Sequence, residues 1–134
     1  MFTHIKTSKD NRETVSRLTW KLNLGTENII ARVAYTYSIS KNRFMDLSVI
    51  KDSQGKEYSK GVLFGDYSPY YISLACVHYN LYKTDKDIPK YIKMHVDDGL
   101  QLIDKEIQDN PNLDGFDYII EKIDNGLESF EMTK

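Results

Sequence analysis

The first forty residues combine a short alternating segment with two apolar repeats of helical period. Residues 2–7 alternate apolar and polar side chains, which is compatible with a β-strand. The next segment predicts a helix that is capped by Ser8 or Asp10 and runs to about Leu24, before the helix-stopping Gly25. Its apolar residues recur three and four positions apart, as one buried helix face requires: Val15, Leu18 and Leu22.

Thr26 restarts the helical pattern after a very short turn. A continuous apolar stripe follows it, formed by Ile29, Ile30, Val33, Ala34 and Tyr37. Strand, helix, tight turn and helix follow one another in the order of a ribbon-helix-helix unit. A lone strand leaves its edge backbone groups unpaired, so we expect it to pair with the strand of a second copy. The pattern thus predicts a homo-oligomer.

The rest of the chain predicts a connection and three more helices. Residues 46–66 contain turn chemistry, and we expect an irregular segment or a β-hairpin there. Helices are predicted over residues 69–82, over residues 87–110 and within residues 112–134, where Asp114 is the expected cap. The last helix carries an apolar stripe on an acidic background: Phe116, Ile119, Ile120, Ile123, Leu127 and Phe130.

Taken together, these elements predict a mainly α chain. It has a ribbon-helix-helix-like amino-terminal unit, a short irregular or hairpin connection, and a helical bundle portion. A chain of 134 residues has the length of one ordinary domain, so we expect a single domain over residues 1–134.

The charge of the chain is unevenly distributed. Residues 1–60 carry 11 basic and 6 acidic side chains, a net charge of +5, whereas residues 61–134 carry 7 and 14, a net charge of −7. A polyanion responds to this local distribution rather than to the whole-chain value of −2. Any phosphate-binding surface should therefore lie in the amino-terminal half, and the alternative is chance polarity of a solvated surface.

The composition excludes several other classes of protein. Cys76 is the only cysteine, so the chain has no internal disulfide and no multi-cysteine zinc site. No stretch approaches the roughly 20 apolar residues that span a bilayer, and the first residues lack the apolar core of a signal peptide. We expect a cytoplasmic protein without membrane contact.

The run from His95 to Gly99 has the most chemical character in the sequence. His95 and Asp98 face the same way on a helix, but Asp97 points elsewhere, and a third convergent metal ligand is missing from the pattern. We expect a solvated acidic pair beside a closely packed Gly99 instead. No Gly-rich phosphate loop and no Gly-x-Ser-x-Gly motif is present. The sequence therefore predicts no catalytic residues, no metal and no cofactor.

The turn between the first two helices is a better candidate for ligand binding. The start of a helix exposes N–H donors and the positive end of the helix dipole, which bind phosphate. Thr26 and Asn28 lie at this start, and Arg17, Lys21 and Arg32 flank it. Ordinary helix punctuation is the alternative interpretation of this turn.

Three segments, in order, resemble the DndE family of DNA sulfur-modification proteins. The segment Gly25–Ala34 is similar to the family's inter-helix turn, in which a Thr and an Asn precede an apolar-Ala-Arg-apolar-Ala helix. Residues 55–67 resemble its Gly-Lys-Glu connection, and residues 95–99 resemble its late His-Val-acidic-Asp-Gly motif. The resemblance covers roughly residues 3–107, which leaves residues 112–134 as an additional amphipathic helix.

This resemblance implies a fold and a function. The fold would be a ribbon-helix-helix-like helical domain that assembles as a homotetramer. DndE-like proteins work with DndC-like and DndD-like partners, which replace a non-bridging phosphate oxygen of DNA by sulfur. Their own role would be to bind double-stranded DNA, especially nicked DNA, without catalysis. The candidate DNA-binding residues are Lys6, Lys9, Arg12, Arg17, Lys21, Thr26, Asn28, Arg32, Lys41 and Arg43.

Two alternative functions remain open at this point. The chain could be a protein-interaction scaffold of the same complex, which the acidic last helix favours. It could also be a ribbon-helix-helix transcription regulator, which reads base edges from paired strands in the major groove. His4 and Lys6 would then be the reading side chains.

Overall fold

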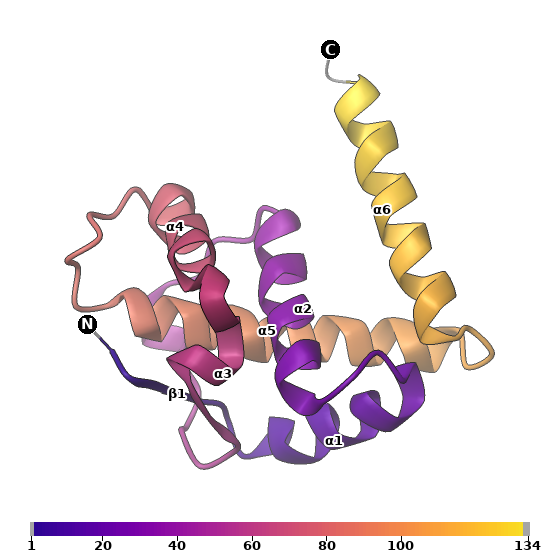
Figure 1. Cartoon of the computed structure of the whole chain (residues 1–134), viewed down its shortest axis with the longest axis horizontal. Coiled ribbons are helices and arrows are strands. Elements are labelled where there is room, and N and C mark those ends of the chain that lie inside the picture. The colour runs from indigo at the N-terminus through magenta and orange to yellow at the C-terminus, as the bar shows by residue number, and fades with distance from the viewer. Residues whose placement is uncertain (1, 133–134) are drawn as a thin grey trace.

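The computed structural model of the chain describes residues 2–132, and its side chains as far as Ser129. Its elements are mostly helical (Figure 1). In chain order they are β1 (His4–Lys6), α1 (Asp10–Leu22), α2 (Glu27–Ser40), η1 (Leu47–Val49), β2 (Glu57–Ser59), α3 (Lys60–Phe64), η2 (Gly65–Tyr67), α4 (Ser68–Tyr79), α5 (Ile88–Asp109) and α6 (Gly115–Met132).

The long helix α5 crosses the length of the body, and α2 makes the most extensive contact with it (Figure 1). Gly99 permits this contact, because a Cβ atom at residue 99 would overlap the carbonyl oxygen of Ala34 in α2. The expected close packing of Gly99 is thus confirmed. α1 and α4 also pack on α5, whereas α6 begins beyond its carboxyl end and projects from the body (Figure 1).

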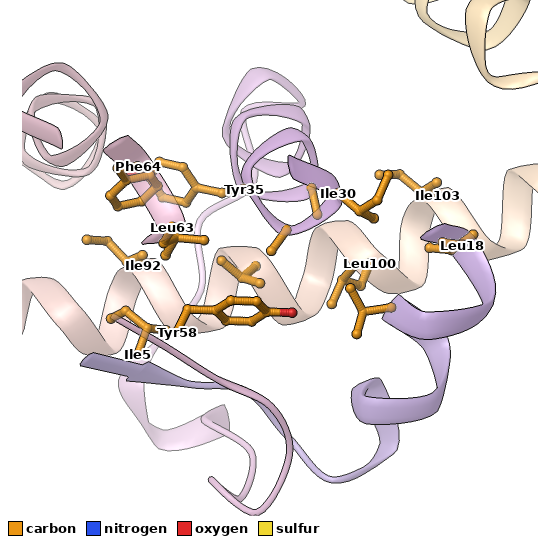
Figure 2. Close-up of a cluster of buried hydrophobic side chains, with 14 of the residues drawn as sticks. Ile5, Leu18, Ile30, Tyr35, Tyr58, Leu63, Phe64, Ile92, Leu100 and Ile103 are labelled. Carbon is orange, nitrogen blue, oxygen red and sulfur yellow. The ribbon is translucent and has the colours of Figure 1, made fainter. Parts of the chain in front are cut away.

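The hydrophobic core lies between α5 and the elements that cover it (Figure 2). Burial of this apolar surface is the main favourable contribution to folding, at roughly 25 cal/mol per Å². The labelled core side chains come from β1, α1, α2, β2, α3 and α5: Ile5, Leu18, Ile30, Tyr35, Tyr58, Leu63, Phe64, Ile92, Leu100 and Ile103.

The amino-terminal strand pairs within the chain. β1 and β2 form an antiparallel pair in which Ile5 lies opposite Tyr58, and both side chains are buried. The expectation that this strand needs a second copy is therefore wrong, because residues 57–59 supply its partner. The expected hairpin within residues 46–66 is wrong for the same reason. β2 pairs with the start of the chain, and residues 46–66 otherwise hold η1, α3 and part of η2.

Both ends of α1 differ from the local signals in the sequence. The backbone N–H of Ser8 donates to Asp97 Oδ1 at 3.0 Å, and that of Lys9 donates to Asp52 Oδ1 at 2.8 Å. The N–H groups just before α1 are therefore bound by carboxylates that are distant in sequence, and not by the local cap that the sequence predicts. The helix ends at Leu22, because Asn23 adopts the left-handed conformation with φ of 52°.

The later helices follow the predictions more closely. α5 covers the predicted segment, and Asp114 caps α6 by accepting from the N–H of Asp117 at 2.8 Å. α4 ends at Tyr79, three residues early, where Asn80 adopts a left-handed φ of 56°. The predicted stripe residue Phe130 lies outside the described side chains.

Candidate nucleic-acid interface

The outer surface of α1 carries the largest group of predicted DNA-binding residues. One side of the helix is buried through Val15, Leu18 and Leu22, so the opposite side faces solvent. The exposed side holds Lys9, Arg12, Arg17 and Lys21, together with the acidic Asp10 and Glu13. This surface is therefore basic overall but not uniformly so.

Trp20, in the last turn of α1, is also exposed beside these basic residues, and the sequence analysis gave it no role. Its side chain is 84% exposed. Trp is usually largely buried, and an exposed aromatic ring next to basic groups is typical of surfaces on which nucleobases or partner proteins pack. The signal was available, because Trp20 falls off the apolar stripe of α1.

The basic residues of α1 lie on two flanks of the helix. Arg12 Nη2 donates to the carbonyl oxygen of Gly55 at 3.0 Å, on the side of the segment before β2. Arg17 Nη2 donates to Asp104 Oδ2 at 2.8 Å, and Lys21 donates to the carbonyl oxygen of Pro111. The structure therefore brings Arg17 and Lys21 together, near the carboxyl end of α5, and separates Arg12 from them.

Lys6 and Lys9 extend this surface toward β1. Lys6 Nζ lies 3.9 Å from Glu57 Oε1, and both side chains are about half exposed. An ion pair of this kind contributes little, typically 0–1 kcal/mol. The Lys6 ammonium can therefore leave Glu57 and bind another anion at little cost. Lys9 is also exposed.

The inter-helix turn is tied to α3. Thr26 is the extended residue before α2, and its side chain contacts that of Asn28. Asn28 Nδ2 donates to the carbonyl oxygen of Val62 at 3.1 Å, and Arg32 Nε donates to that of Leu63 at 2.7 Å. In this arrangement Asn28 and Arg32 satisfy the carbonyl groups of α3, and Thr26 remains exposed.

Lys41 and Arg43 lie beyond the other end of α2. The Lys41 ammonium is 5.2 Å from the centre of the Tyr37 ring, a cation–π contact. Arg43 donates through Nε and Nη2 to the two carboxylate oxygens of Asp98, at 2.8 and 2.9 Å. This bidentate pair joins the segment after α2 to α5. These two residues thus lie at the opposite end of α2 from the turn.

The histidine of the 95–99 run belongs to a buried hydrogen-bond network. His95 Nδ1 lies 2.7 Å from Ser38 Oγ, and its Nε2 lies 2.6 Å from the Tyr79 hydroxyl. Ser38 Oγ also donates to Asp98 Oδ2 at 2.7 Å, so His95 and Asp98 meet at one serine, as their spacing predicts. Burial lowers the pKa of His95 to about 4, with a smaller contribution from His78. His95 is therefore neutral at physiological pH.

Asp97 corrects the expectation of a solvated acidic pair. Its side chain is buried and lies 2.7 Å from the buried ammonium of Lys93. Asp97 Oδ1 also accepts hydrogen bonds from the Ser8 N–H and from Asn11 Nδ2. A buried carboxylate requires such partners, so Asp97 joins α5 to the start of α1.

The three segments that resemble the DndE family contact one another or the same neighbours. Asn28 and Arg32 of the first bind carbonyl groups of the second, and Gly99 of the third packs on Ala34 of the first. Gly55 of the second packs so closely on Ser8 that a Cβ atom would overlap its carbonyl oxygen. The shared motifs thus hold helices and loops together, and the exposed basic side chains lie outside most of them.

Two further properties bear on the possible chemistry. Among residues 2–132, no group of three or more His, Cys, Asp or Glu side chains is arranged to hold a metal ion. In the same part of the chain, every helix is too short or too polar to span a bilayer.

The sequence and the fold are similar to those of known proteins. The sequence model of the DndE family, described as DNA sulphur modification protein DndE, matches residues 4–110. The chain also resembles a crystal structure of DndE from Escherichia coli B7A, described as involved in DNA phosphorothioation modification. This match has 19% identity and a TM-score of 0.63, and it covers 77% of this chain and 98% of that chain.

A second similar crystal structure is that of a DndE mutant involved in DNA phosphorothioation. It matches with 21% identity and a TM-score of 0.64, over 77% of this chain and 98% of that chain. At these identities the likeness shows the fold alone. No curated protein sequence matches the chain significantly.

Proposed function

The chain belongs to the DndE family of DNA sulphur modification proteins, and we therefore propose that it is a non-catalytic, DNA-binding accessory subunit of a DNA phosphorothioate-modification complex. It would act in the cytoplasm, as a homotetramer, beside DndC-like and DndD-like proteins. The observation that carries the proposal is the family match over residues 4–110, together with the exposed basic surface of α1.

The proposed DNA contact centres on Lys9, Arg12, Arg17 and Lys21. Their side chains are exposed. Arg12 and Lys21 donate to backbone carbonyl oxygens, and Arg17 donates to Asp104, whose side chain is only 13% exposed. Phosphate oxygens can replace the carbonyl partners of Arg12 and Lys21, because an exposed hydrogen bond contributes little in water, and the half-exposed guanidinium of Arg17 has further donors for a phosphate. Phosphate contacts of this kind supply affinity without sequence preference. Lys6 and Thr26, which are exposed nearby in the sequence, complete the proposed surface.

Arg32 and Arg43 are secondary members of the proposed site. Their guanidinium groups already satisfy the carbonyl groups of α3 and the carboxylate of Asp98. Asn28 is similarly engaged with Val62, and Lys41 lies at the far end of α2. We propose that Asn28, Arg32 and Arg43 support binding by positioning α2 rather than by neutralising phosphates, and that Lys41 contributes only a peripheral positive charge.

The direct test is a titration of the full-length protein against fluorescent duplexes. One duplex is intact, and the other has the same sequence with a single nick. We expect both to raise the fluorescence anisotropy, the nicked duplex at lower protein concentration, and the affinity to fall steeply with salt. Equal binding of the two duplexes would contradict the preference for nicks, and binding of neither at low salt would contradict DNA binding itself.

A protein-interaction scaffold is the second candidate function. It is favoured by the exposed apolar residues of α4 and α6, which no other described part of the chain covers. The ribbon-helix-helix regulator loses its structural argument, because β1 finds its partner in β2. Failure of the DNA titration, with a folded protein that still binds DndC-like or DndD-like partners, would favour the scaffold.

A further inference from the structure

Helix α6 presents its apolar stripe to solvent. Phe116, Ile120, Ile123 and Leu127 follow one another at intervals of four, three and four residues, which places them on one face of the helix. They are 70%, 42%, 52% and 56% exposed. An exposed apolar face of this length is typical of an interaction surface.

The anchor of α6 lies on the other side of the helix. A Cβ atom at Gly115 would overlap the carbonyl oxygen of Leu22, so α6 begins directly against the end of α1. Tyr118 and Lys122 then donate to the carboxylate of Glu106 in α5, at 2.6 and 2.9 Å. Because this anchor fixes the first two turns, the apolar stripe points away from the body and cannot fold back onto it.

The outer part of α6 has no support from its own chain. Every described residue from 123 to 129 is exposed, and α6 projects from the body in Figure 1. An isolated helical segment this short is marginally stable in water, because helices in proteins are stabilised mainly by packing of their apolar face. A second surface must therefore cover the stripe for the helix to be well formed.

Helix α4 carries a complementary surface. Its twelve residues include no Lys, Arg, Asp or Glu, and it buries Ile72 and Ala75 on one side. On the other side Tyr70, Leu74 and Val77 are exposed at helical spacing, and Tyr67 extends them by one turn. A helix that is apolar all round is normally buried on both sides. The stripe on α4 spans eleven residues and that on α6 spans twelve, so each is about 15–17 Å long at 1.5 Å per residue.

The two surfaces cannot meet within one chain. α4 precedes the amino end of α5 and α6 follows its carboxyl end, and the 22 residues of α5 separate them by about 33 Å. Figure 1 shows α4 and α6 at opposite ends of α5. Contact between them therefore requires a second copy of the chain.

Charge distinguishes α4 from a second α6 as the partner. Asp117, Glu121, Asp124 and Glu128 form an acidic row beside the stripe of α6, so two copies of α6 would bring like charges together. α4 itself has no acidic side chain. The segment that follows it carries Lys83 and Lys86 beside Asp85 and Asp87, and the one acidic residue next to the exposed face is Asp66, before Tyr67. An acidic amphipathic helix is thus better accommodated on α4.

We propose that the apolar stripe of α6 (Phe116, Ile120, Ile123 and Leu127) docks on the exposed face of α4 (Tyr67, Tyr70, Leu74 and Val77) in a second copy of the chain. The contact is head-to-tail, so repetition closes a ring or extends a filament. It lies outside the family-matched residues on the α6 side, and it is independent of DNA binding.

Site-directed cross-linking tests this contact in the full-length protein. In a Cys76→Ser background, one chain carries Leu74→Cys, and a second, tagged chain carries Ile123→Cys. Mild oxidation of the mixture should give a mixed disulfide dimer of about twice 15.6 kDa, whereas each chain alone should give much less. Glu121→Cys, on the acidic flank of α6, is the matched control and should cross-link weakly to Leu74→Cys.

A second measurement uses charge in place of cysteine. Leu74→Glu and Leu127→Glu alter exposed positions, so circular dichroism should show folded proteins, and light scattering should give a lower mass for each than for the parent. A mixture of the two should recover paired chains, since each retains one intact surface. Strong homodimer cross-linking by Ile123→Cys alone would show that two α6 helices pair, and a monomeric parent would show that no second copy covers the stripe. Either result would overturn the proposal.

Discussion

Gly99 of α5 lies against the carbonyl oxygen of Ala34 in α2, with no room between them for a Cβ atom. Neither partner can move easily, because the contact on the α2 side is backbone. The close contact between α2 and α5 therefore requires that residue 99 be glycine, which has a hydrogen atom in place of a side chain.

We predict that Gly99→Ala destabilises the protein by at least about 1–3 kcal/mol, because overpacking a well-packed contact forces backbone shifts. Urea denaturation monitored by circular dichroism measures this loss. Gly126→Ala is the matched control, since Gly126 is also helical and has no atom within 4 Å of a Cβ atom. The control should be neutral or stabilising by up to about 1 kcal/mol, as Ala is the better helix former.

The buried pair of Lys93 and Asp97 gives a second prediction. Asp97→Asn leaves the Lys93 ammonium buried without a counter-charge, so we expect a loss of about 3–5 kcal/mol in the free energy of unfolding. Glu57→Gln removes the partner of Lys6 in an exposed pair and should cost less than about 1 kcal/mol. Equal losses in the two variants would contradict the role assigned to Asp97.

His95 gives a prediction on pH. Its pKa is lowered from 6.5 to about 4 in the folded protein, so between these values the unfolded chain binds a proton that the folded chain does not. The contribution of neutral His95 to the free energy of unfolding should therefore be fully present above pH 6.5. It should fall as the pH is lowered toward 4 and stay constant below that value. The slope contributed by this one group is at most about 1.4 kcal/mol per pH unit.

Denaturant titrations at a series of pH values check this window. His95→Gln retains hydrogen-bonding capacity toward Ser38 or Tyr79 without a titrating ring, and it should flatten the profile between pH 6.5 and 4. The other titratable or charged groups that act on His95, which are His78, Asp98 and Arg43, remain in both proteins. An unchanged profile would assign the pH dependence to other groups.

The proposed footprint on α1 is tested through salt dependence. Replacing Arg12, Arg17 and Lys21 by Ala removes up to three phosphate contacts, and each should reduce the log-affinity against log-salt slope by about 0.9, or up to about 2.7 in total. The loss of affinity should be alike for all duplex sequences. The matched control replaces Lys83 and Lys86, in the segment after α4, and Lys90, in the first turn of α5. If both triple variants lower the slope equally, binding reflects net charge rather than this surface.

Substitution of Arg32 distinguishes a role in stabilising the fold from direct contact with DNA phosphates. Arg32→Ala should lower the free energy of unfolding by about 1–2 kcal/mol, because the carbonyl groups of Val62 and Leu63 lose a charged donor. It should leave the salt slope unchanged. Lys41→Ala, at the exposed end of α2, should alter stability by less than about 0.5 kcal/mol. A reduced salt slope in Arg32→Ala would place Arg32 among the phosphate contacts.

The helices were predictable because their signals are local. The apolar spacing of α1 and α2, the Asp87 and Pro89 start of α5, and the Asp114 cap of α6 all act within one or two turns. The partner of β1 was not predictable in this way. The strand pairs within the chain through residues 57–59, about fifty positions away. The hydrophobic periodicity of the sequence does not indicate which segment will pair with a strand.

The site was predictable only in part, for a similar reason. Net charge directed attention to the amino-terminal half, where DNA contact stays a proposal, but the sequence does not show which basic groups are already engaged. Arg32 and Arg43 bind partners in α3 and α5. Asp97 is buried and forms an ion pair with Lys93, one helical turn away. The exposure of Trp20 follows from its place off the apolar stripe, although the stripe alone assigns it no role.

The hydrogen bond from the Ser8 N–H to Asp97 spans 89 residues, and it sets an order of events during synthesis. The approach to α1 cannot be completed until α5 has left the ribosome. At about 5–20 residues per second, roughly 5–20 seconds pass between translation of the two partners. During this interval β1 and α1 exist without their final contacts.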